Sequence, residues 1–198
     1  MNTLQLVRRL ESINKDYYSL QDLKKITGLG PKPMQIRLNR LVKAQVLVRL
    51  SRGMYVLPGR IAGAESAANN AVYPSYISFQ YALAKLGIIS EVPYIMEFAT
   101  TKSTRKRKIG SVEAVYRKLK KELFFGYSIK NGLFAAEPEK AFLDTMYMKL
   151  YGKEAGFDPA KVDFKKLDKK KLVKYAGKFP AKVKTAVMLE LKKQAEIR

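Results

Sequence analysis

The chain has 198 residues, 47% of them hydrophobic, so it is long enough to bury a core and to form one or two domains. Its 39 basic and 17 acidic residues give a formal net charge of +22. Such an excess attracts polyanions, of which nucleic acid is the commonest, although a solvated surface in a lysine-rich proteome would give the same balance. The absence of cysteine and histidine excludes disulfides and thiolate chemistry, and it removes the commonest general base and metal ligand.

The N-terminal sequence carries no pattern of a targeting segment. Its first ten residues include Asn2, Gln5, Arg8 and Arg9, so they lack the apolar core of a signal peptide. No apolar run approaches the roughly 20 residues that a membrane span requires. We therefore expect a soluble, cytoplasmic protein that does not associate with membranes.

The first two expected helices are short and have clear boundaries. Apolar residues recur at helical spacing over residues 3–13. Ser19 is then a good N-cap for a second helix, with Asp22 at the capping-box position. Gly28 and Gly30 are expected to end that helix.

A third helix and a hairpin complete the N-terminal pattern. Pro31 and Pro33 suit the first turn of a helix that runs to about Gln45. The β-prone runs 46–50 and 54–57 are joined by a Gly-containing turn, which predicts a β-hairpin. Three helices followed by a hairpin is the order of a winged helix-turn-helix.

The third helix has two opposite faces when its residues are projected at about 100° per residue. The buried stripe is expected to contain Met34, Leu38, Leu41, Val42 and Gln45. The opposite face contains Ile36, Asn39, Arg40 and Lys43, with Gln35 and Arg37 on its flanks. A recognition helix must present donors to base edges and cations to phosphates from one exposed face, so we expect this face to bind DNA.

Further candidate DNA contacts flank this face. An exposed Ile36 would suit a thymine methyl group, although single exposed apolar residues are common. Lys32 and the start of the third helix are placed to meet a phosphate. Arg49 and Arg52 flank the glycine turn, as a wing lying across a DNA backbone requires, although charged turns are ordinary. Because winged helices also bind RNA and proteins, the basic face favours DNA but the fold does not decide the function.

The middle of the chain predicts mixed α/β structure. A helix is expected from about Tyr76 to Leu86, with Ser75 as its cap and Gly87 as its stop. A strand follows over 94–100. Residues 102–108 hold five cations in seven positions and are expected to form a basic loop, which is usually solvated.

The last part of the chain predicts a hairpin and three helices. Asn131-Gly132 is the signal for a tight hairpin. Glu137-Pro138-Glu139 then starts a helix that continues to Gly152. Asp168 is expected to cap a helix and Pro180 to open a last one, so the Lys-rich tail is expected to be helical and docked.

Three sequence blocks in this order resemble the AbiEi-like antitoxins, which are the transcription-regulating partners in AbiE-type abortive-infection toxin–antitoxin pairs. The blocks are Arg52-Gly53-Met54-Tyr55-Val56, Pro74-Ser75-Tyr76-Ile77-Ser78 ahead of Ala82-Leu83 and Gly87, and Phe134 to Asp144. The resemblance covers about residues 1–150, and its most specific stretch is Ala136 to Asp144. The tail after Tyr151 is less familiar.

The resemblance implies a function in phage defence. The winged helix would bind inverted repeats upstream of its own operon and repress it, and a second domain would counter a nucleotidyltransferase-like toxin. An inverted-repeat operator would take two copies, either as a homodimer or as monomers side by side. We therefore expect an α+β protein: a winged helix-turn-helix domain over 1–59, a mixed α/β antitoxin-type domain over 60–152, and a Lys-rich helical C-terminal segment over 153–198 packed on it.

The candidate surface of the second domain combines the basic loop with the start of the helix after Glu137. Its members are expected to be Arg105, Lys106, Arg107, Lys140 and Asp144. The basic loop could make a second phosphate contact, or dock to an acidic toxin surface or to toxin-bound RNA. The last two residues are four apart and would form an exposed ion pair of a few tenths of a kcal/mol.

A catalytic or metal site is not expected. Glu137, Glu139 and Asp144 could place three carboxylates near a metal, but a helix cap and an ion pair explain them, and the chain has no phosphate-cradling glycine loop. No cofactor is expected. The alternative function is a non-catalytic binding module whose basic surface binds RNA or a toxin protein rather than an operator. An enzyme acting on nucleic acid is the weakest hypothesis.

Overall fold

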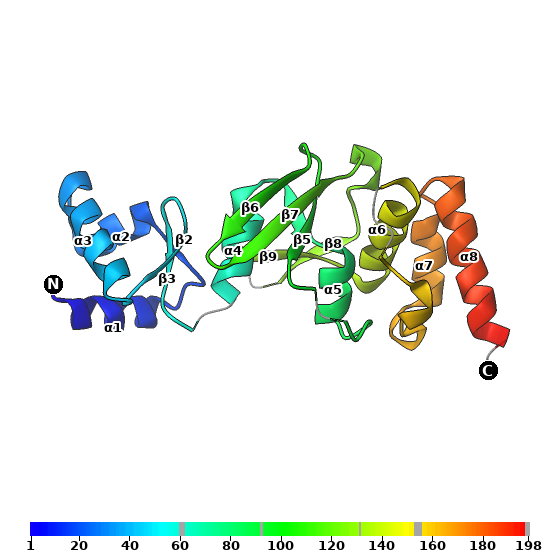
Figure 1. The fold of residues 1–198 in the computed structure, drawn as a ribbon, viewed down its shortest axis with the longest axis horizontal. Coiled ribbons are helices and arrows are strands. Elements are labelled where there is room, and N and C mark those ends of the chain that lie inside the picture. The colour runs from blue at the N-terminus through cyan, green and yellow to red at the C-terminus, as the bar shows by residue number, and fades with distance from the viewer. Residues whose placement is uncertain (60–61, 92, 131, 153–155, 197–198) are drawn as a thin grey trace. The chain divides into compact units, whose positions relative to one another are not determined.

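The computed structural model describes residues 1–59, 62–91, 93–130, 132–152 and 156–196 (Figure 1). The chain is an α+β protein with an N-terminal winged helix, a mixed sheet and C-terminal helices, so the expected fold class is confirmed. It divides into two compact units. Unit 1 consists of Met1–Ala71 and Arg107–Glu113, and unit 2 of Val72–Lys106 and Ala114–Arg198. The expected domain boundaries after residues 59 and 152 stay predictions.

Unit 1 contains the expected three helices and hairpin, together with one short strand and a further helix. The elements in chain order are α1 (Thr3–Ile13), β1 (Tyr18–Ser19), α2 (Leu20–Thr27), α3 (Pro31–Lys43), β2 (Val48–Ser51), β3 (Met54–Val56) and α4 (Ala62–Ala71). The strands form an antiparallel sheet in the order β1-β3-β2, in which β2 is an edge strand.

Helices α1 and α2 begin and end at their expected residues because local caps satisfy their free backbone groups. The Ser19 side chain accepts a hydrogen bond from the Asp22 amide, and the Asp22 carboxylate accepts one from the Ser19 amide, so the capping box of α2 is confirmed. Gly28 ends α2 in the left-handed conformation at φ 71°. Asn2 and Gln5 form a second capping box on α1.

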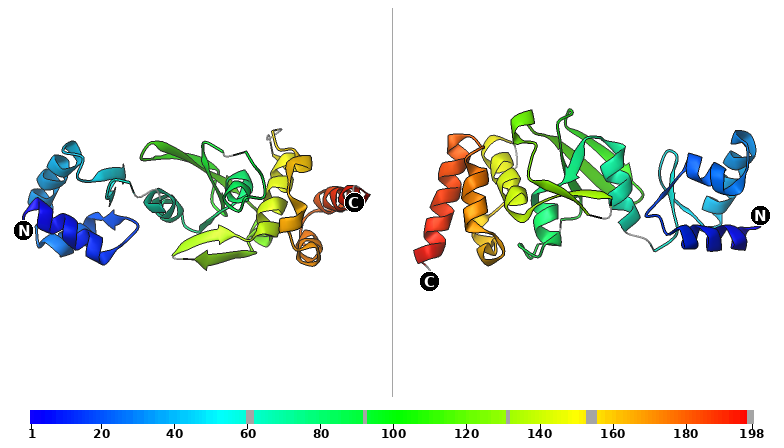
Figure 2. Two further views of the ribbon diagram at one scale, coloured as in Figure 1. Left: turned by 90° about the horizontal axis from the view of Figure 1, so that it is seen from below. Right: turned by 180° about the vertical axis from the view of Figure 1, so that it is seen from behind.

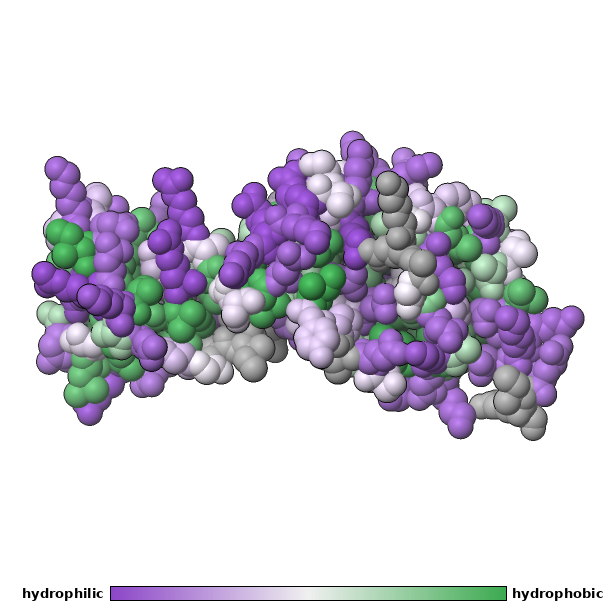
Figure 3. Space-filling view, viewed as in Figure 1, coloured by the Kyte–Doolittle hydropathy of each residue, from purple (hydrophilic) through white to green (hydrophobic). Residues whose placement is uncertain are grey.

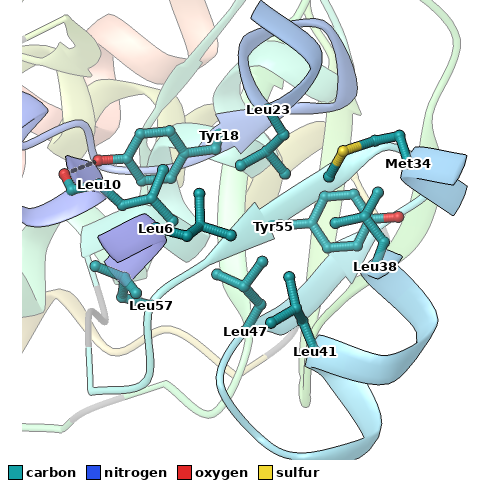
Figure 4. Packing of buried hydrophobic residues seen from close by; sticks show 10 residues of the cluster. All are labelled: Leu6, Leu10, Tyr18, Leu23, Met34, Leu38, Leu41, Leu47, Tyr55 and Leu57. Carbon is teal, nitrogen blue, oxygen red and sulfur yellow. Dashed lines mark hydrogen bonds between the residues drawn. The ribbon is translucent and has the colours of Figure 1, made fainter. Parts of the chain in front are cut away.

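The core of unit 1 joins α1, α2 and α3 to the hairpin (Figure 4). Tyr18 is fully buried, and its hydroxyl donates a hydrogen bond to the carbonyl of Leu10. The cluster consists of Leu6, Leu10, Tyr18, Leu23, Met34, Leu38, Leu41, Leu47, Tyr55 and Leu57. This core fixes which side of α3 faces inward.

The expected end of α3 is wrong by two residues. The helix ends at Lys43, and Gln45 lies beyond it with an exposed side chain and φ of 55°. The Gln45 amide bonds to the carbonyl of Val42, and the Val46 amide reaches back to Leu41, so a tight turn replaces the last helical turn. Gln45 therefore does not belong to the buried stripe.

Unit 2 holds most of a six-stranded mixed sheet. Its strands are β4 (Ser75–Ile77), β5 (Met96–Thr100), β6 (Arg105–Ile109), β7 (Val112–Lys118), β8 (Tyr127–Lys130) and β9 (Leu133–Ala136), in the order β6-β7-β5-β4-β9-β8. β5 runs antiparallel to β4 and parallel to β7, whereas β4 runs parallel to β9. The β8–β9 hairpin confirms the Asn-Gly prediction, with Gly132 at φ 75°, while Asn131 lies outside the described residues.

The helices of unit 2 are α5 (Phe79–Lys85), α6 (Pro138–Tyr151), α7 (Lys169–Ala176) and α8 (Ala181–Glu196), with short 3-10 turns at Lys121–Leu123, Pro159–Lys161 and Phe164–Lys166. Helices α6, α7 and α8 pack against one another (Figure 2). Asp168 caps α7 by accepting a hydrogen bond from the Lys171 amide, as expected. None of the helices in the described part of the chain has the length and apolarity needed to cross a membrane.

Two expectations for unit 2 are wrong. Residues 75–77 form the buried strand β4 instead of the start of a helix, because both edges of this segment pair with strands distant in sequence. The helix begins at Phe79, with Ser78 as its N-cap. The expected basic loop is also partly a strand: from Arg105 onward it forms β6, at one edge of the sheet.

Candidate nucleic-acid interface

Helix α3 turns an apolar side inward and a polar, basic side outward. Met34 and Leu38 are 0% exposed and Leu41 is 5% exposed, so these members of the predicted stripe are confirmed. The opposite side chains are exposed, and they are Lys32, Gln35, Ile36, Asn39, Arg40 and Lys43. Ile36 retains 56% of its accessible surface, so its apolar side chain is available to a ligand. Whether these residues contact DNA stays a prediction.

Arg37, expected on the flank of this face, is engaged within the fold. Its Nη2 donates to the main-chain carbonyl oxygens of Met1 at 2.8 Å and Asn2 at 3.3 Å. The side chain is half-buried and ties α3 to the start of α1. Arg37 is therefore used within the fold, whereas Arg40, about one helical turn further along, is exposed.

The N-terminus of α3 has an unusual set of donors. Gly30 is its N-cap and provides no side-chain cap, while Pro31 and Pro33 occupy its first turn. Proline has no main-chain N–H, so of the first three helical residues only Lys32 carries one. This helix start therefore offers an anion one amide and one ammonium group, fewer amides than a helix N-terminus usually presents.

The wing of the winged helix is the β2–β3 hairpin. Its turn passes through Gly53 at φ 76°, which a residue with a side chain rarely adopts. Arg49 and Arg52 are both exposed on this hairpin, and Nε of Arg49 contacts the carbonyl of Ser51 at 3.4 Å. The pairing register shifts between Arg49 and Ser51, as in a β-bulge. Both predicted wing cations are thus accessible.

All charged residues in the segment that contains α3 and the wing are basic. Residues 31–56 contain no Asp or Glu, and they carry six cations, namely Lys32, Arg37, Arg40, Lys43, Arg49 and Arg52. Hydrophilic side chains gather over α3 and over the tip of the β2–β3 hairpin (Figure 3). Without acidic neighbours in the segment, the positive potential there is not cancelled locally, so a polyanion is the ligand that this face suits.

The predicted placement of Lys140 and Asp144 on the antitoxin-domain surface is wrong. Both side chains are 0% exposed, and the Lys140 ammonium forms an ion pair with Oδ1 of Asp144. Oδ2 of Asp144 accepts hydrogen bonds from the hydroxyls of Tyr76 at 2.9 Å and Ser78 at 2.8 Å. Nζ of Lys140 donates to the Tyr76 hydroxyl at 2.8 Å. These four side chains join α6 to β4 and to the residue that caps α5.

The surroundings of this buried cluster are aromatic. Nζ of Lys140 lies 5.1 Å from the ring centroid of Phe125 and 5.2 Å from that of Phe179. Burial raises the pKa of Asp144 and lowers that of Lys140, because both charges are removed from water. Burial beside the Asp144 carboxylate also raises the pKa of Tyr76. The cluster can hold the fold together, but it cannot face a partner.

The burial of Lys140 and Asp144 could not be predicted from their four-residue spacing, but it could be predicted from the apolar residues around them in α6. The apolar residues of this part of α6 point to several sides of the helix, and all four are buried: Ala141, Phe142, Leu143 and Met146. A helix that is apolar around most of its circumference is an interior helix. Its charged residues must then be paired inside the protein.

The remaining predicted residues of the second surface lie on β6. Arg105 is half-buried, and its guanidinium donates to the carbonyl of Ser103 at 3.2 Å and to its hydroxyl at 2.6 Å. Lys106 and Arg107 are exposed. The structure therefore does not bring all five predicted residues to one surface.

Two further carboxylates, one on the N-cap of α6 and one in its first turn, hold α7 in place. Glu137 accepts a hydrogen bond from the Tyr175 hydroxyl at 2.6 Å, and Oε1 of Glu139 accepts one from the Asp168 amide at 2.9 Å. The Lys171 ammonium lies 3.2 Å from Glu137 and 3.5 Å from Glu139. Among the described residues, no three acidic side chains are grouped as a metal ion would require.

Comparison with known proteins shows a likeness to a regulator family and to solved structures. Residues 5–58 match the family described as a transcriptional regulator, AbiEi antitoxin. The resemblance to AbiEi-like antitoxins is thereby confirmed over the winged helix. The fold is similar to that in the crystal structure of the RV2827C protein from Mycobacterium tuberculosis, with a TM-score of 0.61 and 14% identity over 90% of this chain and 72% of that chain. No curated protein matches the chain.

Proposed function

Because residues 5–58 carry the sequence features of the AbiEi antitoxin transcriptional regulators, we propose that this chain is a DNA-binding repressor of its own toxin–antitoxin operon. In this proposal it acts in the cytoplasm, as the antitoxin of a nucleotidyltransferase-like toxin in an abortive-infection system against phage. The observation that carries the DNA-binding part is the exposed face of α3, which joins basic and amide side chains on a segment free of acidic residues.

The proposed binding mode places α3 in the major groove. Asn39 and Arg40 would donate to base edges, where each well-formed bidentate contact contributes about 1–3 kcal/mol of discrimination. Ile36 would contact a thymine methyl group. Phosphates on either side would be bound by Lys32, Gln35 and Lys43 and by the wing cations Arg49 and Arg52, which fix the register without reading the sequence.

The proposed operator is an inverted repeat that binds two copies of the chain. A two-fold related pair of recognition helices would enter successive major grooves about 34–36 Å apart. The copies could meet as a homodimer or bind side by side as monomers.

The proposed antitoxin role rests on the family match of residues 5–58, and it requires no catalytic site. We assign it no cofactor or metal. Of the second-domain residues, Arg105, Lys106 and Arg107 remain candidates for a partner surface. Lys140 and Asp144 do not, because both are buried.

The decisive experiment is footprinting of the promoter region with the full chain, followed by binding measurements on the protected duplex. Arg40→Ala should lose the preference for the operator over a scrambled duplex by about 1–3 kcal/mol. Lys32→Ala and Arg52→Ala should weaken both duplexes alike and reduce the salt slope by about one each. Arg8→Ala is a matched control, because Arg8 is exposed on α1 and lies opposite the buried Leu6 on that helix.

The outcomes separate the proposal from its alternative. If Arg40→Ala binds the operator as tightly as the wild-type protein does, α3 is not the reading helix. If the wild-type protein prefers RNA or an acidic toxin protein over any promoter duplex, the basic face serves a binding module of another kind and the repressor proposal fails.

A further inference from the structure

The turn between β6 and β7 is attached to the wing of the winged helix. This segment, Arg107–Glu113, belongs to unit 1 together with α3 and the wing. Within that unit, the Gly110 amide donates a hydrogen bond of 2.7 Å to the carbonyl of Leu50. Leu50 lies in β2, at the position where the register with β3 shifts. The β6–β7 turn therefore binds a main-chain acceptor on the edge strand of the small sheet.

Apolar packing reinforces this hydrogen bond. Ile109 is 1% exposed and Leu50 is 7% exposed, and both line one small hollow together with Val48 and Val56. Gly110 has φ of 62°, and a Cβ added there would lie 3.3 Å from Cδ2 of Leu50. The turn is thus fitted to the wing by shape as well as by a hydrogen bond.

The attachment brings two further cations to the wing. Arg107 and Lys108 are exposed, and they precede Gly110 by three and two residues. At about 3.3 Å per residue, their Cα atoms lie within roughly 10 Å of the Gly110 amide. Arg49 and Arg52 are likewise close to Leu50 along the chain, at one and two residues from it. Four exposed cations therefore lie within three residues of the hydrogen bond that joins the turn to the wing.

We propose that Arg107 and Lys108 extend the duplex-binding surface beyond the wing and contact phosphates that flank each half-site. This inference rests on the proposed function of α3 and the wing, and it adds a segment that lies outside the matched residues 5–58. Placing like charges together costs free energy, which a phosphate backbone would offset on binding. The contacts would raise affinity and salt dependence but not sequence preference, because phosphates carry no base identity.

A competing explanation comes from the position of β6 at the edge of its sheet. Cations on an edge strand discourage pairing with another chain, and this alone would account for Arg107 and Lys108. In that role the two cations would only keep the protein from aggregating. It predicts no effect on DNA affinity, so the two explanations differ in a measurable quantity.

The test is fluorescence anisotropy of the full chain on operator duplexes over a range of salt concentrations. The Arg107→Gln/Lys108→Gln variant should reduce the salt slope by about 1.8, at about 0.9 for each phosphate that the variant no longer neutralises. Its ratio of operator to scrambled-duplex affinity should equal that of the wild-type protein. The matched control is Lys118→Gln/Lys120→Gln, which removes two exposed lysines from and just beyond the far end of β7 and should leave the slope unchanged.

Trimming the duplex gives a second, independent readout. As base pairs outside the inverted repeat are removed, the wild-type protein should lose affinity until it matches the Arg107→Gln/Lys108→Gln variant, which should be insensitive to trimming. The inference is overturned if this variant keeps the wild-type affinity and salt slope. If the variant keeps both and aggregates more readily, the edge-strand explanation accounts for the two cations instead. If the wild-type protein shows no operator preference at all, the proposed function fails and the inference fails with it.

Discussion

Replacing Lys140 with methionine should strongly destabilise the protein. Methionine nearly matches the length and apolar character of the lysine stem, so the change removes the ammonium group and leaves little cavity. It leaves Asp144, which is 0% exposed, without its ionic partner. Breaking a buried ion pair by removing one member costs about 3–5 kcal/mol, a large part of the roughly 5–15 kcal/mol that stabilises a typical domain.

The structure places the expected cost near the lower end of this range. Asp144 would still accept hydrogen bonds from Tyr76 and Ser78, so its carboxylate would not be fully unsatisfied. The cost should also depend on pH. Burial raises the pKa of Asp144, and an acid with a raised folded-state pKa favours the native state at low pH and loses that contribution as the pH rises through the folded value. Loss of Lys140 raises this pKa further, so Lys140→Met should be least destabilising in acid.

The assay is urea unfolding followed by circular dichroism at several pH values, with Lys184→Met as the control. Lys184 is exposed on α8, so its replacement should change the free energy of unfolding by no more than about 0.5 kcal/mol. The reasoning is refuted if Lys140→Met costs less than about 1 kcal/mol at neutral pH and shows the same cost in acid, since the pair would then contribute no more than an exposed one.

Three further predictions concern unit 1. Ser19→Ala should lower the free energy of unfolding by about 1 kcal/mol, measured by urea unfolding, because it removes the side-chain cap of α2; an unchanged midpoint would contradict the capping role. Burial tends to raise the pKa of Asp22, but hydrogen bonds from Lys15 and Ser19 outweigh it and hold this pKa below its ordinary value of 3.8. An acid with a depressed pKa contributes stability that is lost as the pH falls through the folded value, so Asp22→Asn should flatten the acid limb of the stability curve, and an identical limb would count against it. Arg37→Ala should lower the melting temperature without changing operator preference, the reverse of Arg40→Ala; a loss of preference with unchanged melting would show that Arg37 contacts DNA instead of the start of α1.

Features set by neighbouring residues could be predicted from the sequence. The capping box at Ser19, the glycine stop at Gly28, and the Asn-Gly hairpin each depend on residues within a few positions, so their patterns are local. The inward side of α3 was predictable for the same reason, because helical periodicity depends only on spacing along the chain. The exposed face of the candidate site could therefore be predicted from the sequence, except for the hydrogen bonds between Arg37 and the main chain of Met1 and Asn2.

Features set by distant partners could not be predicted. β4 is a strand because β5 and β9 pair with its two edges, and neither partner lies near it in sequence. The ion pair of α6 is buried against Tyr76 and Ser78, which lie 64 and 66 residues from their partners Lys140 and Asp144. The attachment of Gly110 to Leu50 likewise joins distant segments. In each case, the local pattern was compatible with more than one environment.

The two prolines at the start of α3 have a consequence for the thermodynamics of DNA binding. Their rings restrict the backbone before any ligand arrives, and the core holds Met34 and Leu38 in place. The segment that meets the duplex thus has little disorder left to lose. Calorimetry of operator binding should therefore show a modest negative heat-capacity change, well short of the signature of a peptide that folds as it docks.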